Sequence, residues 1–182
     1  MQSLRLSHEQ IQNIVDHAKN DLPNEACGLI GGLNGKVLHI IPIKNVANNP
    51  QVHYLMDANE QLQALKQFDQ QNIEWLGVYH SHPNGKAIPS QEDSRSAELN
   101  TPNLCHVIVG LKNQDVHLQA WHIHNAEIDP VELLIGQQNS YSIAPMSKVQ
   151  IWAIILAIVI AVILLLGMSF NLLPPAPPIP TP

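Results

Sequence analysis

The positions of apolar and polar residues along the first quarter of the chain predict one helix and two strands. Apolar residues recur at helical spacing after Ser7, whose sequence Ser-His-Glu-Gln has the form of a capping box, and residues 21–24 end this pattern. Two apolar runs follow, at residues 26–31 and 37–43, and the Asn34–Gly35 pair between them is typical of a hairpin turn. We therefore expect a helix that is followed directly by a β-hairpin.

The next part of the chain predicts a short strand, a helix and a long strand. Residues 52–56 have a strand-like pattern, and Asp57 opens a second capping box, Asp-Ala-Asn-Glu. The apolar side of the helix that follows carries Leu62, Leu65 and Phe68. The apolar run at residues 74–82 predicts a central strand, which ends at Pro83 because proline cannot donate a hydrogen bond to a neighbouring strand.

The remaining part of the folded region predicts a short helix and three strands. Ser90 is placed to cap a helix that reaches about residue 99. Residues 104–111 and 116–122 predict a hairpin around Asn113–Gln114, and residues 131–135 predict a last strand. Helices that alternate with strands in this way indicate a mixed α/β domain.

The C-terminal part of the chain has a different character. Residues 151–168 are apolar except for the indole N–H of Trp152, and this length favours a transmembrane helix, which needs about 20 apolar residues. The alternative is a buried helix, but a domain of this size could hardly surround one. We expect a domain at residues 1–136, a linker at 137–148, a transmembrane helix at 149–170 and a proline-rich tail at 171–182.

Three features predict that the domain faces the cytosol and that one C-terminal helix anchors it. The N-terminal residues lack the apolar core of a signal peptide. Lys148 flanks the apolar stretch on the domain side, in agreement with the positive-inside rule. Cys27 and Cys105 are isolated thiols in apolar runs, which is typical of a reducing compartment.

The charge of the chain argues against nucleic acid as a partner, and the number of its histidines suggests a metal site. With 9 Lys and Arg against 15 Asp and Glu, the net charge is -6, which is not the basic footprint of a nucleic-acid-binding protein. The 10 histidines make a metal site worth seeking, although only their spacing can support one.

One histidine pair has the spacing of a metal site. His80 and His82 lie two residues apart at the end of a predicted strand, so their side chains project to the same face. Asp93, in the first turn of the helix that Ser90 caps, can supply a third ligand. Two imidazoles and one carboxylate leave a fourth position open, as in catalytic zinc sites. Glu25, at the mouth of the first buried strand, is the candidate base for a water bound there.

These residues together resemble the JAMM motif of the MPN superfamily of zinc metallopeptidases. The positions that match are Glu25, His80, His82, Pro83, Ser90 and Asp93. The resemblance implies a JAMM-like fold, similar to cytidine deaminases, in which helices flank a mixed curved β-sheet. It implies that zinc binds to His80, His82 and Asp93. It also implies that Glu25 is the general base and later the proton donor, while Ser90 hydrogen-bonds the oxyanion or orients the water.

The family resemblance also implies a substrate class. Its members hydrolyse amide bonds, often isopeptide bonds or C-terminal extensions of ubiquitin-fold proteins. The segment between Asp93 and the predicted strand at 104–111 is too short for the insertions that grip ubiquitin in well-known deubiquitinating members. We therefore expect a protein or peptide substrate, such as a small ubiquitin-fold sulfur carrier. The alternatives are a non-catalytic MPN-type scaffold at the membrane and a membrane adaptor that presents the proline tail.

Each of these residues also has a simpler interpretation. Ser90 is a helix cap in any case, and Glu25 taken alone would be a solvated carboxylate. Cys27 is expected to be a small buried residue and not a ligand, because the ligand set is already complete. His122 and His124 have the same spacing as the metal-binding pair but no matching carboxylate motif, so we expect them to form only a surface strand end.

Overall fold

The computed structural model describes residues 3–112, 115–125 and 127–136, together with residues 152, 156–162 and 165 of the C-terminal part. The chain divides into two units, residues 1–138 and 139–182. The first unit contains, in chain order, β1 Ser3–Leu6, α1 His8–Asn20, β2 Cys27–Leu33, β3 Lys36–Ile43, α2 Ala58–Gln70, β4 Glu74–His82, α3 Gln91–Asn100, β5 Cys105–Lys112, β6 Asp115–His124 and β7 Glu127–Ile135.

The strands form a mixed sheet that closes into a barrel in the order β1-β3-β2-β4-β5-β6-β7. The central pair β4 and β5 is parallel, and antiparallel strands flank it on both sides. The mixed sheet and its flanking helices were predicted, but the closure was not. It depends on β1, which pairs in parallel with β7 and, through Arg5 and Lys36, with β3. A strand of four residues directly before a helix has too short a pattern to be recognised in the sequence.

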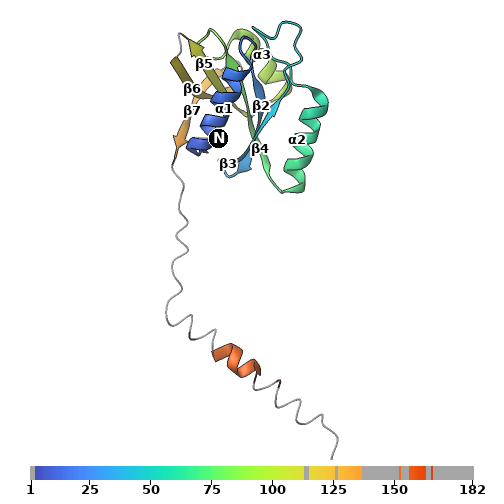
Figure 1. Ribbon diagram of the computed structural model, residues 1–182, viewed down its shortest axis with the longest axis vertical. Coiled ribbons are helices and arrows are strands. Elements are labelled where there is room, and N and C mark those ends of the chain that lie inside the picture. The colour runs from blue at the N-terminus through green and yellow to red at the C-terminus, as the bar shows by residue number, and fades with distance from the viewer. Residues whose placement is uncertain are drawn as a thin grey trace, which may run out of the picture. The chain divides into compact units, whose positions relative to one another are not determined.

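Two helices cover opposite faces of the sheet because adjacent strand residues point to opposite sides. Ile14 and Ala18 of α1 pack into the larger core cluster with Ile30 of β2. Phe68 of α2 packs against Leu29 of the same strand in a second cluster. In Figure 1, α2 lies at the edge of the unit away from β6 and β7, and α1 lies across the strands between them.

The predicted elements agree with the structure at most positions. The capping box of Ser7 opens α1, and both residues of the Asn34–Gly35 turn have positive φ, 52° and 74°. Strand β4 has the predicted bounds, and Ser90 caps α3. The hairpin turn at residues 113–114 lies outside the described residues, but β5 and β6 pair as expected.

Three local predictions are wrong. Residues 52–56 do not form a strand, because this stretch pairs only through the isolated bridge between Met56 and Asn45. Asp57 caps α2 as expected, but Glu60 does not complete the box, since its carboxylate accepts from the Lys44 backbone N–H instead, at 2.7 Å. Leu62 was expected on the apolar side of α2 but is 51% exposed, and the buried residues of this helix are Ala64 and Phe68.

Among the residues that the structure describes, no helix has both the length and the apolar character that crossing a membrane requires. The predicted transmembrane segment, residues 149–170, lies mostly outside the described residues, as do the linker at 137–148 and the tail at 171–182. These three assignments therefore stay predictions.

Candidate metal centre

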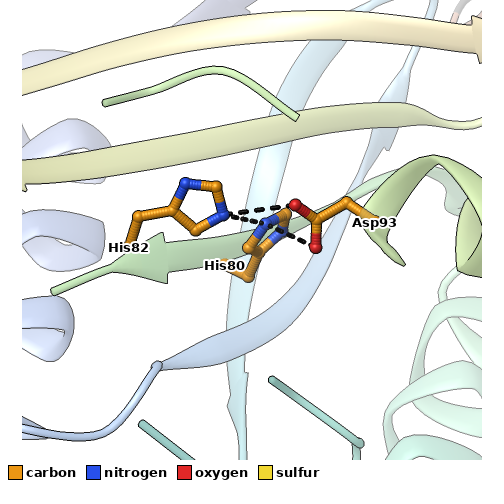
Figure 2. A group of neighbouring side chains, drawn as sticks. All are labelled: His80, His82 and Asp93. Atoms are coloured by element: carbon orange, nitrogen blue, oxygen red, sulfur yellow. Dashed lines mark hydrogen bonds and ion pairs between the residues drawn. The ribbon is translucent and has the colours of Figure 1, made fainter. Parts of the chain in front are cut away.

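The end of β4 and the first turn of α3 bring three potential ligands together. His80 Nε2 and His82 Nε2 lie 3.1 Å apart. The carboxylate of Asp93 places one oxygen 3.4 Å from His80 Nε2 and the other 3.2 Å from His82 Nε2. Figure 2 shows the three side chains converging from the strand and the helix. The structure therefore assembles the three residues that the sequence predicts as metal ligands.

These distances fit a zinc ion. Ligands about 2.0–2.1 Å from a tetrahedral ion lie about 3.3 Å from one another. The two Nε2 atoms lie 3.1 Å apart, and each lies 3.2–3.4 Å from one oxygen of the Asp93 carboxylate, which is close to that value. Two imidazoles and a carboxylate are also a ligand set that zinc uses in sites with an open fourth position. Zn²⁺ is therefore the cofactor that fits this centre without rearrangement of its side chains.

The surroundings of His80 and Asp93 favour the protonation states that a metal requires. His80 is 0% exposed, and burial lowers the pKa of its imidazole, which keeps the ring neutral and able to ligate. Burial opposes ionisation of Asp93, but hydrogen bonds with His80 and His82 outweigh this effect and hold the pKa of its carboxyl well below the usual range. Asp93 is therefore a carboxylate at neutral pH.

Ser90 and Asp93 hold each other at the N-terminus of α3. The Asp93 N–H donates to Ser90 Oγ at 3.1 Å, and the Ser90 N–H donates to Asp93 Oδ2 at 2.7 Å. This capping box fixes the ligand carboxylate to the start of the helix. The predicted cap role of Ser90 is confirmed, and its catalytic role stays a prediction.

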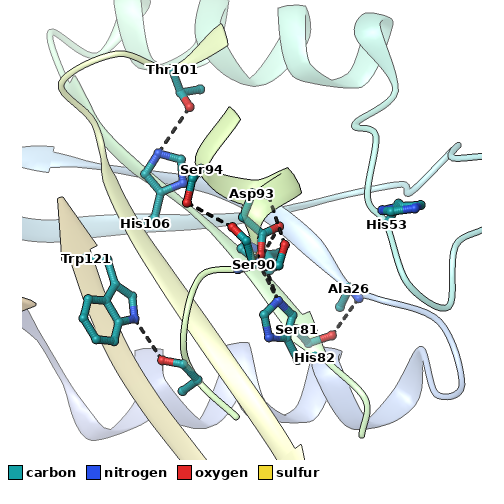
Figure 3. A network of polar contacts seen from close by, with 12 residues as sticks. Ala26, His53, Ser81, His82, Ser90, Asp93, Ser94, Thr101, His106 and Trp121 are labelled. Carbon is teal, nitrogen blue, oxygen red and sulfur yellow. Dashed lines mark hydrogen bonds and ion pairs between the residues drawn. The ribbon is translucent and has the colours of Figure 1, made fainter. Parts of the chain in front are cut away.

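Glu25 lies two residues before β2, where the sheet register places it beside the histidines. Cys27 pairs with His80 across the strands, and the pairing continues one step further through Ala26 and Ser81. The next residue outward is Glu25, and it is only 5% exposed. Figure 3 shows the Ala26–Ser81 contact next to His82 and Asp93.

The environment of Glu25 changes its acidity. Burial raises the pKa of its carboxyl from 4.5 to about 7, with Asp93 adding to the rise and His82 opposing it. A carboxylate with a pKa near neutrality is suited both to accept and to return a proton.

Sequence reasoning did not identify two further contacts of the histidines. Tyr54 stacks on His80, with ring centroids 4.5 Å apart and an angle of 22° between the rings. The Lys86 carbonyl accepts from His82 Nδ1 at 2.9 Å, which orients the ring so that Nε2 is directed at the centre. In the sequence, Tyr54 is distinguished only as a single aromatic residue in a polar loop. A backbone carbonyl leaves no sequence signal.

Comparison with known proteins identifies the family to which this site belongs. Residues 7–124 match the family described as prokaryotic homologs of the JAB domain. The chain therefore belongs to the JAMM/MPN family. The match includes every residue of the predicted motif from Glu25 to Asp93 and ends at the last residue of β6.

Relatives of this JAMM/MPN chain are named as peptidases. A probable TtuB-protein conjugate cleaving protease of Thermus thermophilus is 37% identical over 94 residues, which cover 52% of this chain and 61% of that protein. A CysO-cysteine peptidase of Mycobacterium tuberculosis is 29% identical over 129 residues, which cover 68% of this chain and 86% of that protein. The chain thus spans less than two thirds of the Thermus relative. Both relatives are named for peptidase activity.

A solved structure supports the fold independently. The solution structure of protein DSY2949 from Desulfitobacterium hafniense is 33% identical, with a TM-score of 0.67. It covers 76% of this chain, and the match spans 97% of that protein. The likeness supports the JAMM-type α/β fold of the first unit.

Cys27 and the second histidine pair remain outside the centre. Cys27 is fully buried, and its thiol donates to the Ile43 carbonyl at 3.4 Å. Burial raises the pKa of this thiol to about 12, so it does not become a thiolate ligand at neutral pH. His122 and His124 lie on β6 and take no part in the contacts of the centre.

Proposed function

We propose that this chain is a zinc metallopeptidase that hydrolyses an amide or isopeptide bond with Glu25 as its general base. The main support is geometric. The two imidazole Nε2 atoms lie 3.1 Å apart, and each lies within 3.4 Å of an oxygen of the Asp93 carboxylate. The buried carboxyl of Glu25, whose pKa burial raises to about 7 in the metal-free protein, lies beside them. A scaffold without catalysis would not need a buried base beside a metal site, because burying a carboxylate costs stability.

The division of roles follows from the contacts. When bound, Zn²⁺ supplies Lewis acidity, which brings the pKa of a water molecule down to about 7 and polarises a carbonyl. Glu25 takes the proton from the attacking water as its oxygen adds to the scissile carbonyl carbon. The same carboxyl then gives that proton to the leaving amine nitrogen as the C–N bond breaks. The raised pKa of Glu25 suits both steps.

Ser90 is positioned to stabilise the developing oxyanion. Its Oγ accepts the Asp93 N–H, and its hydroxyl also contributes to holding the Asp93 carboxyl ionised. The hydroxyl is exposed at the mouth of the centre, so a substrate oxygen can receive its proton as a hydrogen bond. Hydrogen bonds of this kind typically contribute about 2.7–4 kcal/mol to transition-state stabilisation.

The substrate class we propose is a protein joined through its C-terminus, of the ubiquitin-fold or sulfur-carrier type. The named relatives support this class, since one cleaves TtuB–protein conjugates and another acts on CysO–cysteine. The chain has no long insertion after the ligand helix. Helix α3 ends at Asn100 and β5 begins at Cys105, which leaves only a short connection. This supports a small protein with an extended C-terminus as the substrate.

We also propose that the enzyme is anchored to a membrane by residues 149–170, with its catalytic domain in the cytoplasm. The support is the uncharged apolar sequence of residues 151–168 and the position of Lys148 before it. Anchoring would raise the effective concentration of substrates that reach the same surface.

A cleavage assay with matched variants tests the proposed activity. The whole chain with one equivalent of zinc is incubated with a small ubiquitin-fold protein joined through its C-terminus either to a lysine side chain or to cysteine. We expect Glu25→Gln to keep its zinc and to lose about 10²–10⁴-fold in rate, as expected when a general base is removed. The double variant His80→Ala/His82→Ala should lose both zinc and activity. Glu25→Gln with wild-type activity would refute the mechanism.

A further inference from the structure

A second group of metal-binding side chains lies at the end of the β6–β7 hairpin. The strand register pairs His122 with Asp129 and His124 with Glu127. Residues that pair directly, or that lie two apart on one strand, project to the same face of the sheet. The two imidazoles and two carboxylates therefore share one face of the hairpin.

The side chains on this face change from apolar to polar where the core ends. Ala120 and Val131 form the neighbouring pair on the same face, and both are buried in the main hydrophobic cluster. The two pairs beyond them, out to the tip of the hairpin, carry only His, Asp and Glu side chains. An apolar pair would be expected if this end of the hairpin packed against the core. A set of nitrogen and oxygen donors indicates a different role.

The donor atoms already lie close to one another. His124 Nε2 is 3.7 Å from Glu127 Oε2 and 3.9 Å from Asp129 Oδ2. The three ligand atoms lie within 4.8 Å of one another. The rings of His122 and His124 have centroids 4.7 Å apart, so the second imidazole is also within reach.

A small inward movement would bring these donors to zinc distances. A tetrahedral ion needs ligand atoms about 3.3 Å apart. His124 Nε2 lies 3.7 and 3.9 Å from the two carboxylate oxygens, and all three atoms lie within 4.8 Å of one another. The side chains of Glu127 and Asp129 are 74% and 63% exposed, so they are free to make this adjustment. Their exposure also gives an ion direct access from solvent.

We propose that His124, Glu127 and Asp129, with His122 as a fourth donor, bind a second divalent cation of the zinc class. Imidazole nitrogen favours zinc and its transition-metal neighbours over Mg²⁺ and Ca²⁺, which prefer oxygen ligands alone. Two carboxylates balance the charge of the ion. The bound cation links β6 to β7 at the end of the hairpin.

The sequence alone did not indicate this site because its two halves come from different strands. His122-x-His124 has no carboxylate at the spacing of the JAMM motif, so it was expected to form only a strand end. The antiparallel register supplies both carboxylates from β7. The second site shares no residue with the centre of His80, His82 and Asp93, so each can be removed separately.

Counting bound zinc tests the proposal. The untagged chain of residues 1–182 is stripped of metal and dialysed against micromolar zinc. Metal is then measured by plasma mass spectrometry. We expect two equivalents for the wild type and one for His124→Ala. We expect one for His80→Ala/His82→Ala and none for the triple variant. The pair Glu127→Gln/Asp129→Asn should behave like His124→Ala.

Two control variants remove similar groups from the same strands outside the cluster. His117→Ala removes an exposed histidine of β6, and Glu132→Gln removes an exposed carboxylate of β7. Both should keep two equivalents. Retention of the first equivalent in His124→Ala shows that the variant is folded.

The outcomes separate this proposal from the proposed function. If the wild type binds one equivalent of zinc and His80→Ala/His82→Ala binds none, the hairpin group is only a cluster of ion pairs. A second equivalent that survives both His124→Ala and Glu127→Gln/Asp129→Asn would place the ion elsewhere. Either result overturns the second site and leaves the first untouched. If the wild type binds one equivalent of zinc, which is lost in His124→Ala but kept in His80→Ala/His82→Ala, the catalytic centre is refuted instead.

Discussion

Ala26 and Ser81 form two hydrogen bonds with each other at the point where β2 and β4 leave the core. The Ser81 N–H donates to the Ala26 carbonyl at 2.9 Å, and the Ala26 N–H donates to Ser81 Oγ at 2.8 Å. Ala26 directly follows Glu25, and Ser81 lies between the two histidines. This reciprocal contact therefore holds the proposed base in register with the proposed ligands.

Removing the Ser81 hydroxyl should uncouple the base from the metal. In Ser81→Ala the buried Ala26 N–H loses its partner, which costs about 1–3 kcal/mol of unfolding free energy. We expect kcat to fall at least tenfold while zinc stoichiometry stays the same, because neither ligand is changed. Ser96→Ala removes an exposed serine hydroxyl of α3 as a control and should change neither quantity. A variant with lower stability but unchanged kcat would show that the contact is only structural.

The raised pKa of Glu25 predicts a specific dependence of stability on pH in the metal-free protein. The carboxyl titrates at 4.5 when unfolded and at about 7 when folded. Between these values the folded state holds a proton that the unfolded state has released, so folding stability decreases as pH rises through this window. The loss is complete above the folded pKa and absent below 4.5. By linkage, this loss of folding stability amounts to at most about 3 kcal/mol.

Glu25→Gln should remove this component. Urea unfolding of the chelator-treated proteins at about pH 5 and about pH 8 gives the free energy of unfolding of the wild type and of the variant at each pH. We expect the variant to gain stability relative to the wild type at the higher pH. Glu92→Gln controls for the loss of one negative charge at an exposed site of α3. Equal pH dependence in wild type and Glu25→Gln would show that burial does not perturb this carboxyl.

Most of the centre could be predicted from the sequence because its ligands are close together in the chain. His80 and His82 share one strand, and Asp93 sits one turn into the helix that follows, so strand and helix periodicity alone bring them together. Glu25 is far away in sequence. Its place at the mouth of a buried strand made it a candidate base, and the resemblance to a known motif then connected it to the ligands. The register of Cys27 with His80 supplies the physical reason for that connection.

What the sequence did not predict depends on long-range pairing. The closing strand β1 is too short to have a pattern of its own, and its partners β3 and β7 lie far along the chain. Tyr54 reaches His80 from a loop that has no secondary structure at that residue. Glu127 and Asp129 follow His124 within a few residues, but their place opposite the two histidines depends on the local register of β6 and β7.

The stacking of Tyr54 on His80 predicts a contribution to metal affinity. The phenol ring covers the imidazole and restricts its rotation, so the ligand stays directed at the centre. Loss of such a pair typically costs about 0.5–1.5 kcal/mol, or about a 2–10-fold rise in the Kd for zinc. We expect this change in Tyr54→Ala, measured by competition with a chelator. Tyr54→Phe keeps the ring and should keep the wild-type Kd; equal weakening in both variants would assign the effect to the hydroxyl.

The apolar segment predicts that the chain partitions into membranes. Residues 151–168 carry no charge, and a helix of that length approaches the thickness of the hydrocarbon core. We expect the whole chain to sediment with vesicles and to resist extraction at high salt and high pH. A truncation after Ser147 should be released into the soluble fraction. Its retention on the membrane would show that another part of the chain provides the attachment.

The orientation of that anchor follows from the few charges around it. Lys148 precedes the apolar segment, and none of residues 149–182 is Lys or Arg, so the positive-inside rule places the domain side in the cytoplasm. Both cysteines of the domain are buried free thiols, which is compatible with a reducing compartment. We expect protease added to sealed vesicles, with their cytosolic face outward, to digest an epitope at the N-terminus and to spare one added after Pro182. The reverse pattern would place the catalytic centre across the membrane from the cytoplasm.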